Sequence, residues 1–411
     1  MDTKALKQKI LDLAIHGKLV PQDPNDEPAT ELLEKTWKKK NENLNSNQVI
    51  NAAPYQLPEG WAWTLLESYT LSITDGDHQA PPKSETGIPF LVISDVAKGK
   101  IDFSHARFVT QSYYDGITPN RKAQQGDILF TVTGSYGIVV MVNTNRKFCF
   151  QRHIGLIKPA VYGEFLYYIL QSSYVKNYCD KKATGTAQKT VGLETLRNMP
   201  VPIPPLAEQK RIVSRIKELF SVIDNIENSK NDIIETISKA KDKILDLAIS
   251  GKLLPKRSQW KEYILDDLLK YEQPQKYIVR STEYSDAYDT PVLTAGKSFI
   301  LGYTNEVDNI YDNLPCIIFD DFTTDCKYVD FKFKVKSSAM KILHPKSGMN
   351  SKFLYYLVKV NREQHITHKR YWISIVSQRK VNVPKLQEQN DIVSKVQQLY
   401  SVLDKIQENI K

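Results

Sequence analysis

The stretch that decides the fold runs from Pro205 to Pro255 and reads PLAEQKRIVSRIKELFSVIDNIENSKNDIIETISKAKDKILDLAISGKLLP. Between Pro205 and Gly251 it contains neither proline nor glycine, the two residues that interrupt helices most strongly. Its apolar side chains recur every seven residues in two rows that lie four residues apart, and this spacing predicts a coiled-coil helix of some 45 residues, about 65 Å long. The rows are Ile212, Leu219, Ile226, Ile233, Ala240 and Leu247, and Ile216, Ile223, Ile237 and Ile244, with Lys230 interrupting the second row.

Both ends of this stretch recur elsewhere in the chain. KDKILDLAISGKLLP (241–255) matches KQKILDLAIHGKLVP (7–21) at twelve of fifteen positions, and VPIPPLAEQKRIVSRIKELFSVIDNI (201–226) matches VNVPKLQEQNDIVSKVQQLYSVLDKI (381–406). The central helix is therefore one whole copy, and the two ends of the chain supply the halves of another. We expect a circularly closed two-fold repeat, in which residues 1–22 continue in space the helix that ends at Lys411, and two long helices that pack antiparallel.

Two globular units flank the central helix in the sequence. The first contains strand-like runs rich in β-branched and aromatic residues, such as IPFLVISDV and GDILFTVTGSYGIVVMVN, then a predicted helix at EFLYYILQSSYVKNYCDK (164–181) and the polar loop KKATGTAQKTVG. The second repeats these pieces in the same order with TPVLTAG, CIIFDDF and KFLYYLV. Between the shared pieces nearly every residue differs, so the two units are expected to present different surfaces.

The predicted fold class is α+β, with two mixed α/β domains separated by the two long helices. A short helix is expected at Ala29–Lys40 within the connector that joins the first helix to the first unit. The predicted division of the chain is an N-terminal helix at 1–22, the connector at 23–56, the first unit at 57–204, the central helix at 205–255, the second unit at 256–384 and the C-terminal helix at 385–411.

Composition excludes several classes of protein. The chain has no run of eighteen apolar residues and no apolar leader, so we expect a cytoplasmic protein without a membrane span. Its four cysteines show no CxxC pairing and are expected to be reduced structural thiols. The formal net charge of +9 on 411 residues favours a polyanionic partner.

No catalytic motif is complete. PVLTAGKS (291–298) ends like a phosphate-binding loop but has Pro291 where the first glycine must stand. Glu208-Gln209-Lys210 has the Glu-x-Lys order of some nucleases, yet it begins a helix and recurs as Glu388-Gln389-Asn390 without the lysine. We therefore interpret Glu208 as a first-turn residue favoured by the helix dipole. No Asn-Pro-Pro-aromatic motif is present and no histidine falls in a metal or triad pattern, so we expect a chain that is not an enzyme and binds no metal or cofactor itself.

The doubled helix ends resemble the specificity subunit of type I restriction-modification enzymes. The resemblance lies in ILDLAIHGKLVPQ with ILDLAISGKLLP, IPPLAEQKRIVSRI with VPKLQEQNDIVSKV, LPEGW (57–61) and GDILFTVTGS (126–135). It implies that each globular unit is a target recognition domain reading half of a split DNA site. It also implies docking of two methyltransferase subunits and of translocase-nuclease subunits, with S-adenosylmethionine, ATP and Mg on those partners. From the residues alone, a coiled-coil scaffold that bridges two protein clients without reading DNA remains the alternative.

Reading DNA requires cationic and hydroxyl groups for phosphates, and Arg, Lys, Asn, Gln or Ser for base edges. The loops after the predicted strands offer such side chains in both units. The DNA-binding candidates are Ser94, Arg121, Lys122, Ser135, Tyr136, Arg152, Thr184, Gln188 and Lys189 in the first unit, and Lys297, Tyr303, Lys334, Lys336, Lys369, Arg370 and Tyr371 in the second.

Overall fold

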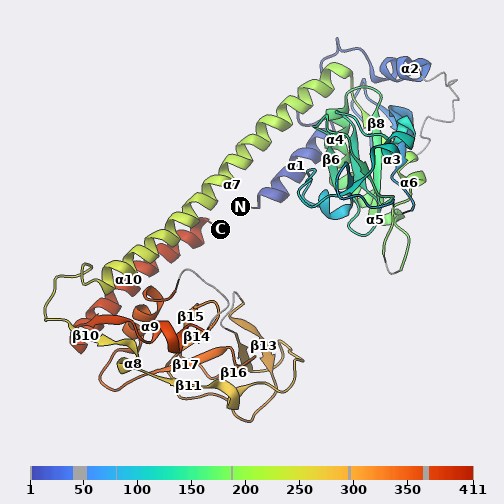
Figure 1. Cartoon of the computed structure of the whole chain (residues 1–411). Coiled ribbons are helices and arrows are strands. Elements are labelled where there is room, and N and C mark those ends of the chain that lie inside the picture. Colours follow the sequence, from blue (N-terminus) through green and yellow to red (C-terminus); the bar gives the residue numbers. More distant parts are fainter. Residues whose placement is uncertain are drawn as a thin grey trace. The chain divides into compact units, whose positions relative to one another are not determined.

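The computed structural model describes residues 2–39, 53–79, 81–186, 188–294, 298–363 and 370–410 (Figure 1). The chain forms two compact units, Met1–Asn228 and Ser229–Lys411. The boundary falls inside the long helix α7 (Leu206–Ile249), which therefore contributes its first half to unit 1 and its second half to unit 2. Among the described residues, no helix has the length and apolar character that crossing a membrane requires.

Unit 1 combines short strands with helices that pack on them. Before α7 its elements are α1 (Thr3–Ile15), α2 (Ala29–Lys39), β1 (Ala62–Leu65), η2 (Leu66–Tyr69), β2 (Thr70–Asp75), β3 (Ile88–Leu91), η3 (Ile93–Asp95), β4 (Arg107–Val109), α3 (Gln111–Gly116), η4 (Pro119–Arg121), β5 (Ile128–Thr131), β6 (Val139–Met141), β7 (Cys149–Phe150), β8 (Ile154–Pro159), α4 (Gly163–Leu170), α5 (Ser173–Lys182), α6 (Leu193–Arg197) and β9 (Pro200–Ile203).

Unit 2 follows the same plan. After α7 its elements are β10 (Lys261–Ile264), α8 (Leu265–Leu268), β11 (Leu269–Glu272), η5 (Pro274–Tyr277), β12 (Thr290–Leu293), β13 (Ile300–Thr304), β14 (Cys316–Asp320), β15 (Cys326–Val329), β16 (Lys334–Val335), β17 (Met340–Pro345), α9 (Ser351–Val360), the π-helical turn η6 (Trp372–Val376), β18 (Lys380–Val383) and α10 (Leu386–Ile410).

The strands of the two units correspond one to one. The four-stranded sheet has the order β2-β8-β5-β6 in unit 1 and β11-β17-β14-β15 in unit 2, and the three-stranded sheets are β4-β3-β7 and β13-β12-β16. In each three-stranded sheet the central strand pairs antiparallel with one neighbour and parallel with the other. The two-stranded pairs β1-β9 and β10-β18 join the two ends of each globular part. The predicted mixed architecture in two repeated units is confirmed.

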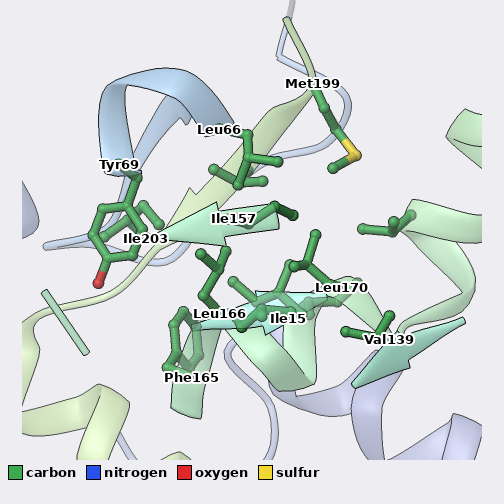
Figure 2. Packing of buried hydrophobic residues seen from close by; sticks show 14 of the residues in the cluster. Ile15, Leu66, Tyr69, Val139, Ile157, Phe165, Leu166, Leu170, Met199 and Ile203 are labelled. Atoms are coloured by element: carbon green, nitrogen blue, oxygen red, sulfur yellow. The ribbon is translucent and has the colours of Figure 1, made fainter. Parts of the chain in front are cut away.

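Helix α1 is part of the core of unit 1. Figure 2 shows Ile15 of α1 packed with Phe165, Leu166 and Leu170 of α4 and with Ile157 of β8. The same buried cluster continues into the first half of α7 and, like other cores of this kind, is stabilised mainly by apolar burial. The core thus fastens the helices of unit 1 to its sheets.

Each half of α7 has its own antiparallel partner. In unit 1, Lys7 Nζ of α1 lies 2.5 Å from Asp224 Oδ1 of α7. In unit 2, Lys241 Nζ of α7 lies 2.5 Å from Asp404 Oδ1 of α10. The sequence repeat equates Lys7 with Lys241 and Asp224 with Asp404, so both helix pairs use the same ion pair. The predicted continuity in space between residues 1–22 and the C-terminal helix stays a prediction.

Several local predictions need correction. The helix expected at 164–181 is two helices, because Ser172 caps the start of α5 through its side chain. Strands β9 and β18 were not predicted, since their proline-rich surroundings conceal the pattern of a strand. The apolar rows of α7 are buried at Ile223 and Ile237, but Ile226 and Ile233 between them are exposed. The apolar seam of α7 is therefore buried at Ile223 in unit 1 and at Ile237 in unit 2, and its two isoleucines between these positions are exposed.

Candidate nucleic-acid interface

Two loops of unit 1 that are distant in sequence lie together. One follows β5 and contains Thr133 and Gly134; the other precedes α6 and contains Lys189 and Thr190. Gly134 N donates to Lys189 O at 2.9 Å, and Thr190 Oγ1 donates to Thr133 Oγ1 at 3.3 Å. The bonds hold the two polar loops as one surface, which we call the unit 1 loop pair (residues 132–137, 184–186 and 188–191).

A groove of about 400 Å³ opens beside the unit 1 loop pair. Arg152 and Gln188, both predicted from the sequence, line the groove and are exposed. Ser135, Thr184 and Lys189 are exposed on the loop pair itself. The structure thus brings five of the predicted side chains to one part of the surface. The residues lining the groove are Asp75, His78, Val132, Thr133, Arg152, His153, Gln188, Thr190, Val191, Gly192 and Leu193.

Sequence reasoning missed the two histidines of this groove. His78 Nε2 lies 2.9 Å from Asp75 Oδ2. Burial, and then the positive charge of Arg152, lowers the pKa of His153 below its usual value, which favours a neutral imidazole at pH 7. A neutral imidazole can donate one hydrogen bond and accept another, as a base edge requires. Isolated histidines carry no spacing signal, so only the fold could place them here.

Four other predicted residues of unit 1 have internal partners. Arg121 Nε donates to Asp75 O at 2.8 Å, and its guanidinium also donates to Gly76 O. The remaining three also donate to protein groups. Lys122 Nζ donates to Asp115 O at 3.1 Å, Tyr136 Oη donates to Asp180 Oδ1 at 2.8 Å, and the exposed Ser94 donates to Asp95 Oδ1 of its own turn at 3.4 Å. Contacts of these four residues with DNA stay predictions.

Two predictions in unit 2 are wrong. Lys334 is only 1% exposed, and its ammonium group binds Asp308 O at 2.7 Å and a Glu306 carboxylate oxygen at 2.9 Å. Tyr371 is 2% exposed and packs in the core. Neither side chain can contact DNA, because both are enclosed by the protein.

The other unit 2 candidates differ in their accessibility. Lys336 and Arg370 are exposed, and Tyr303 is half-buried on β13. Lys297 and Lys369 lie outside the described residues. The accessible cationic candidates of this unit that the structure describes are therefore Lys336 and Arg370.

The loop after β14 is built differently from its counterpart after β5. Strand pairing equates Lys341 with Gly155 and Asp320 with Thr131, so the residues that follow, Asp321 and Val132, occupy equivalent places. Their backbone amides make equivalent hydrogen bonds, to Ala339 O and to His153 O. Asp321 Oδ1 accepts hydrogen bonds from Tyr371 N at 3.0 Å and Trp372 N at 2.8 Å, and Lys341 Nζ lies 3.6 Å from its carboxylate. A buried ion pair therefore stands where unit 1 has a valine and a glycine. The sequence signal for this buried ion pair was an aspartate within the apolar run CIIFDDF.

Two buried glutamates attach the long helices to the globular parts. Glu208 accepts a hydrogen bond from Trp61 Nε1 at 2.9 Å, and at the equivalent position Glu388 accepts one from Trp260 Nε1 at 3.0 Å. Glu208 lies in the first turn of α7, as predicted, and its contact with Trp61 is an additional role that the sequence analysis did not include. Lys210, the third residue of the Glu-x-Lys sequence, points to solvent. The repeated Glu-Gln in both helix starts was the signal for this shared anchor.

The comparisons with known proteins agree with this architecture. A family model described as "Type I restriction modification DNA specificity domain" matches residues 81–236 and 257–411. The chain belongs to this family, and the resemblance inferred from the repeated helix ends is confirmed.

Particular relatives align over parts of the chain. The EcoR124I/EcoR124II specificity subunit of Escherichia coli is 45% identical over 147 residues, which cover 34% of this chain and 36% of the relative. The EcoEI specificity subunit of Escherichia coli is 27% identical over 267 residues, which cover 60% of this chain and 45% of the relative. The chain thus spans less than half the length of either relative.

A solved structure shares the fold. A chain from a structure of the complex assembly and conformational transition of the type I R-M system superposes with a TM-score of 0.63. The match covers 87% of this chain and 94% of that chain at 17% sequence identity. At this identity the likeness supports the arrangement of helices and strands.

Proposed function

We propose that this protein is the non-catalytic DNA sequence-specificity subunit of a type I restriction-modification complex. The observation that carries the proposal is a single topology used twice, with different side chains in the loops at the equivalent place. After Thr131 and Asp320, the last residues that strand pairing equates, unit 1 continues with Val132 and Thr133 and unit 2 with Asp321 and Phe322. Each unit reads one half of a bipartite DNA site, and α7 sets the gap between the halves.

In unit 1, the groove beside the loop pair supplies the groups that read bases. The guanidinium of Arg152 can donate two parallel hydrogen bonds to a guanine edge, and the amide of Gln188 can do the equivalent with adenine. Lys189 contacts phosphate, which adds affinity without sequence information. Removal of Arg152 or Gln188 therefore affects base preference, whereas removal of Lys189 affects affinity for all sequences.

The chemistry belongs to partner subunits. Two methyltransferase subunits supply S-adenosylmethionine and the pocket for a flipped adenine, and translocase-nuclease subunits supply ATP- and Mg-dependent cleavage. The specificity chain positions those partners on the DNA. Its family membership supports this assignment.

The test is methylome sequencing of a host that expresses the chain with its partner subunits, compared with a host that lacks the gene. We expect one bipartite motif that depends on the gene. Arg152→Ala should reduce discrimination at a single base pair of one half of that motif by roughly 1–3 kcal/mol. In the methylome, that half of the motif should be relaxed at this position or lost. Arg107→Ala, which removes another exposed arginine of unit 1, is the matched control and should leave the motif intact.

A gel shift separates this function from a protein scaffold. Specific binding to duplex DNA should weaken steeply as salt rises, because each phosphate contact releases a counterion. Absence of salt-sensitive binding, together with an unchanged methylome, would support the scaffold instead.

A further inference from the structure

The turn after β14 holds an aromatic ring toward solvent. Phe322 is 43% exposed, whereas the residues on both sides of this turn are fastened. Asp320 Oδ1 accepts hydrogen bonds from Phe322 N at 2.8 Å and Thr323 N at 3.0 Å. Thr324 is fully buried and donates to Glu363 O at 2.7 Å. The backbone of the turn is therefore preorganised, and the exposure of the ring is not the result of a loose loop.

A second exposed apolar side chain is attached to the same buried group. Ile373 of η6 is 61% exposed. The two residues before it, Tyr371 and Trp372, donate their backbone amides to Asp321, the residue before Phe322. The buried Asp321 carboxylate thus ties the turn to η6, and each tied segment continues directly into an exposed apolar residue. We call Phe322 and Ile373 the unit 2 apolar pair.

The apolar pair stands where unit 1 is polar. Counted from Thr131 and Asp320, the last residues that strand pairing equates, Phe322 is the second residue along the chain in unit 2, as Thr133 is in unit 1. Thr133 lines the groove that contains Arg152 and Gln188. Arg370, exposed and next to Tyr371 in sequence, supplies a positive charge of the kind that contacts DNA phosphate. Its charge favours a nucleic-acid occupant for this surface over a neutral protein surface. Where unit 1 has a threonine that lines its groove, unit 2 therefore has an exposed phenylalanine.

Among base edges in the major groove, only thymine presents an apolar group, its C5-methyl. We propose that Phe322 makes an apolar contact with the methyl group of a thymine in the half-site read by unit 2. The inference rests on the proposed function, in which the methylated base is adenine, so that each half-site contains at least one A·T pair. Phe322 is then a specificity-determining residue of unit 2.

The test measures binding of the reconstituted complex to duplexes in which each thymine of the unit 2 half-site is replaced, one at a time, by uracil, which lacks the methyl group. At one position, uracil should weaken binding of the unaltered complex about fourfold, the effect of exposing one buried methyl group. Phe322→Ala should weaken binding to the thymine duplex by at least as much and should no longer distinguish thymine from uracil there. Phe322→Leu, which keeps an apolar side chain, should retain part of the discrimination.

Val307→Ala is the matched control, because Val307 is 83% exposed in the same unit. It should bind both duplexes as the unaltered chain does, and all variants should unfold at the same temperature. Equal thymine–uracil discrimination by Phe322→Ala and the unaltered chain would overturn the inference. The inference would also be overturned if Phe322→Ala prevented subunit assembly but left thymine–uracil discrimination intact. That result would assign Phe322 to a contact with a partner protein. Failure of the unaltered complex to bind any bipartite site would instead refute the proposed function.

Discussion

Glu208 and Glu388 occupy equivalent positions and accept the same tryptophan hydrogen bond, yet their pKa values move in opposite directions. For Glu208, burial is the largest influence and raises the pKa above its usual value. Burial also acts on Glu388, but hydrogen bonds from Ser258, Trp260 and the neighbouring backbone amides outweigh it and lower the pKa. The additional donors at Glu388 favour the charged carboxylate. Ionisation therefore stabilises the contact between Glu388 and Trp260 in unit 2.

Replacing Glu388 tests this difference. Because its folded-state pKa lies below the unfolded value of 4.5, its ionised carboxylate stabilises the fold above pH 4.5, and this contribution disappears as pH falls through the folded pKa. Glu388→Gln should therefore lower the free energy of unfolding by roughly 1.5–3 kcal/mol at pH 7, with a smaller difference in acid. Glu208→Gln, the matched variant, should cost less at pH 7, since its carboxylate has a raised pKa. Urea unfolding between pH 7 and pH 3.5 measures both; a pH-independent loss for Glu388→Gln would contradict the explanation.

At the scale of elements, α7 changes partner along its length. Its first half packs in the core that contains α1, and its second half pairs with α10. The apolar seam that makes both contacts is one continuous pattern in the sequence, but the partners come from opposite ends of the chain. A helix of 44 residues is stabilised by this packing more than by intrinsic propensity.

Neighbouring residues on α7 provide a sharp test of the seam. Ile223 is 3% exposed and Val222 is 52% exposed. Ile223→Asp should destabilise unit 1 by about 3 kcal/mol or more, because it buries a charge without a partner. Val222→Asp should change stability by less than about 0.5 kcal/mol, because its side chain faces water. Thermal unfolding followed by circular dichroism at 222 nm measures both; similar losses in the two variants would show that the seam is wrongly assigned.

At the scale of the whole molecule, the repeat separates parts that are kept from parts that vary. The sheet orders and the Lys–Asp pairs beside α7 are the same in both units. The loops after β5 and β14 differ in charge, in polarity and in how they are held. In the proposed function, this division makes the long helix a spacer and the globular units the readers.

An insertion in the spacer tests the division. Four residues added near 228–231, at the unit boundary, lengthen α7 by about 6 Å, close to the rise of two base pairs. The gap between half-sites should lengthen while both half-sites stay the same. As the control, exchange of residues 61–201 for the equivalent unit of a relative should change one half-site and leave the gap. Methylome sequencing distinguishes the two results; altered half-site bases after the insertion would contradict the separation of spacer from readers.

The sequence by itself determined the long helix, its two repeated ends and the family. The predicted central helix agrees closely with α7, and the helix expected at Ala29–Lys40 with α2 (Ala29–Lys39). These features were accessible because helix periodicity, proline and glycine act over a few residues. The polar loops of unit 1 were found for the same reason, since Ser135, Thr184 and Gln188 lie in runs of turn-forming residues.

Only the tertiary structure decided which of those side chains share a surface and which are enclosed. Lys334 and Tyr371 are residue types that often contact DNA. In the structure, Lys334 is buried and binds Glu306 and Asp308, and Tyr371 is buried in the core of unit 2. Asp321 and Lys341 were invisible as a pair because 20 positions of chain separate them. Burial and pairing are set by strands brought together across the sheet, and such long-range contacts leave no periodic trace in the local sequence.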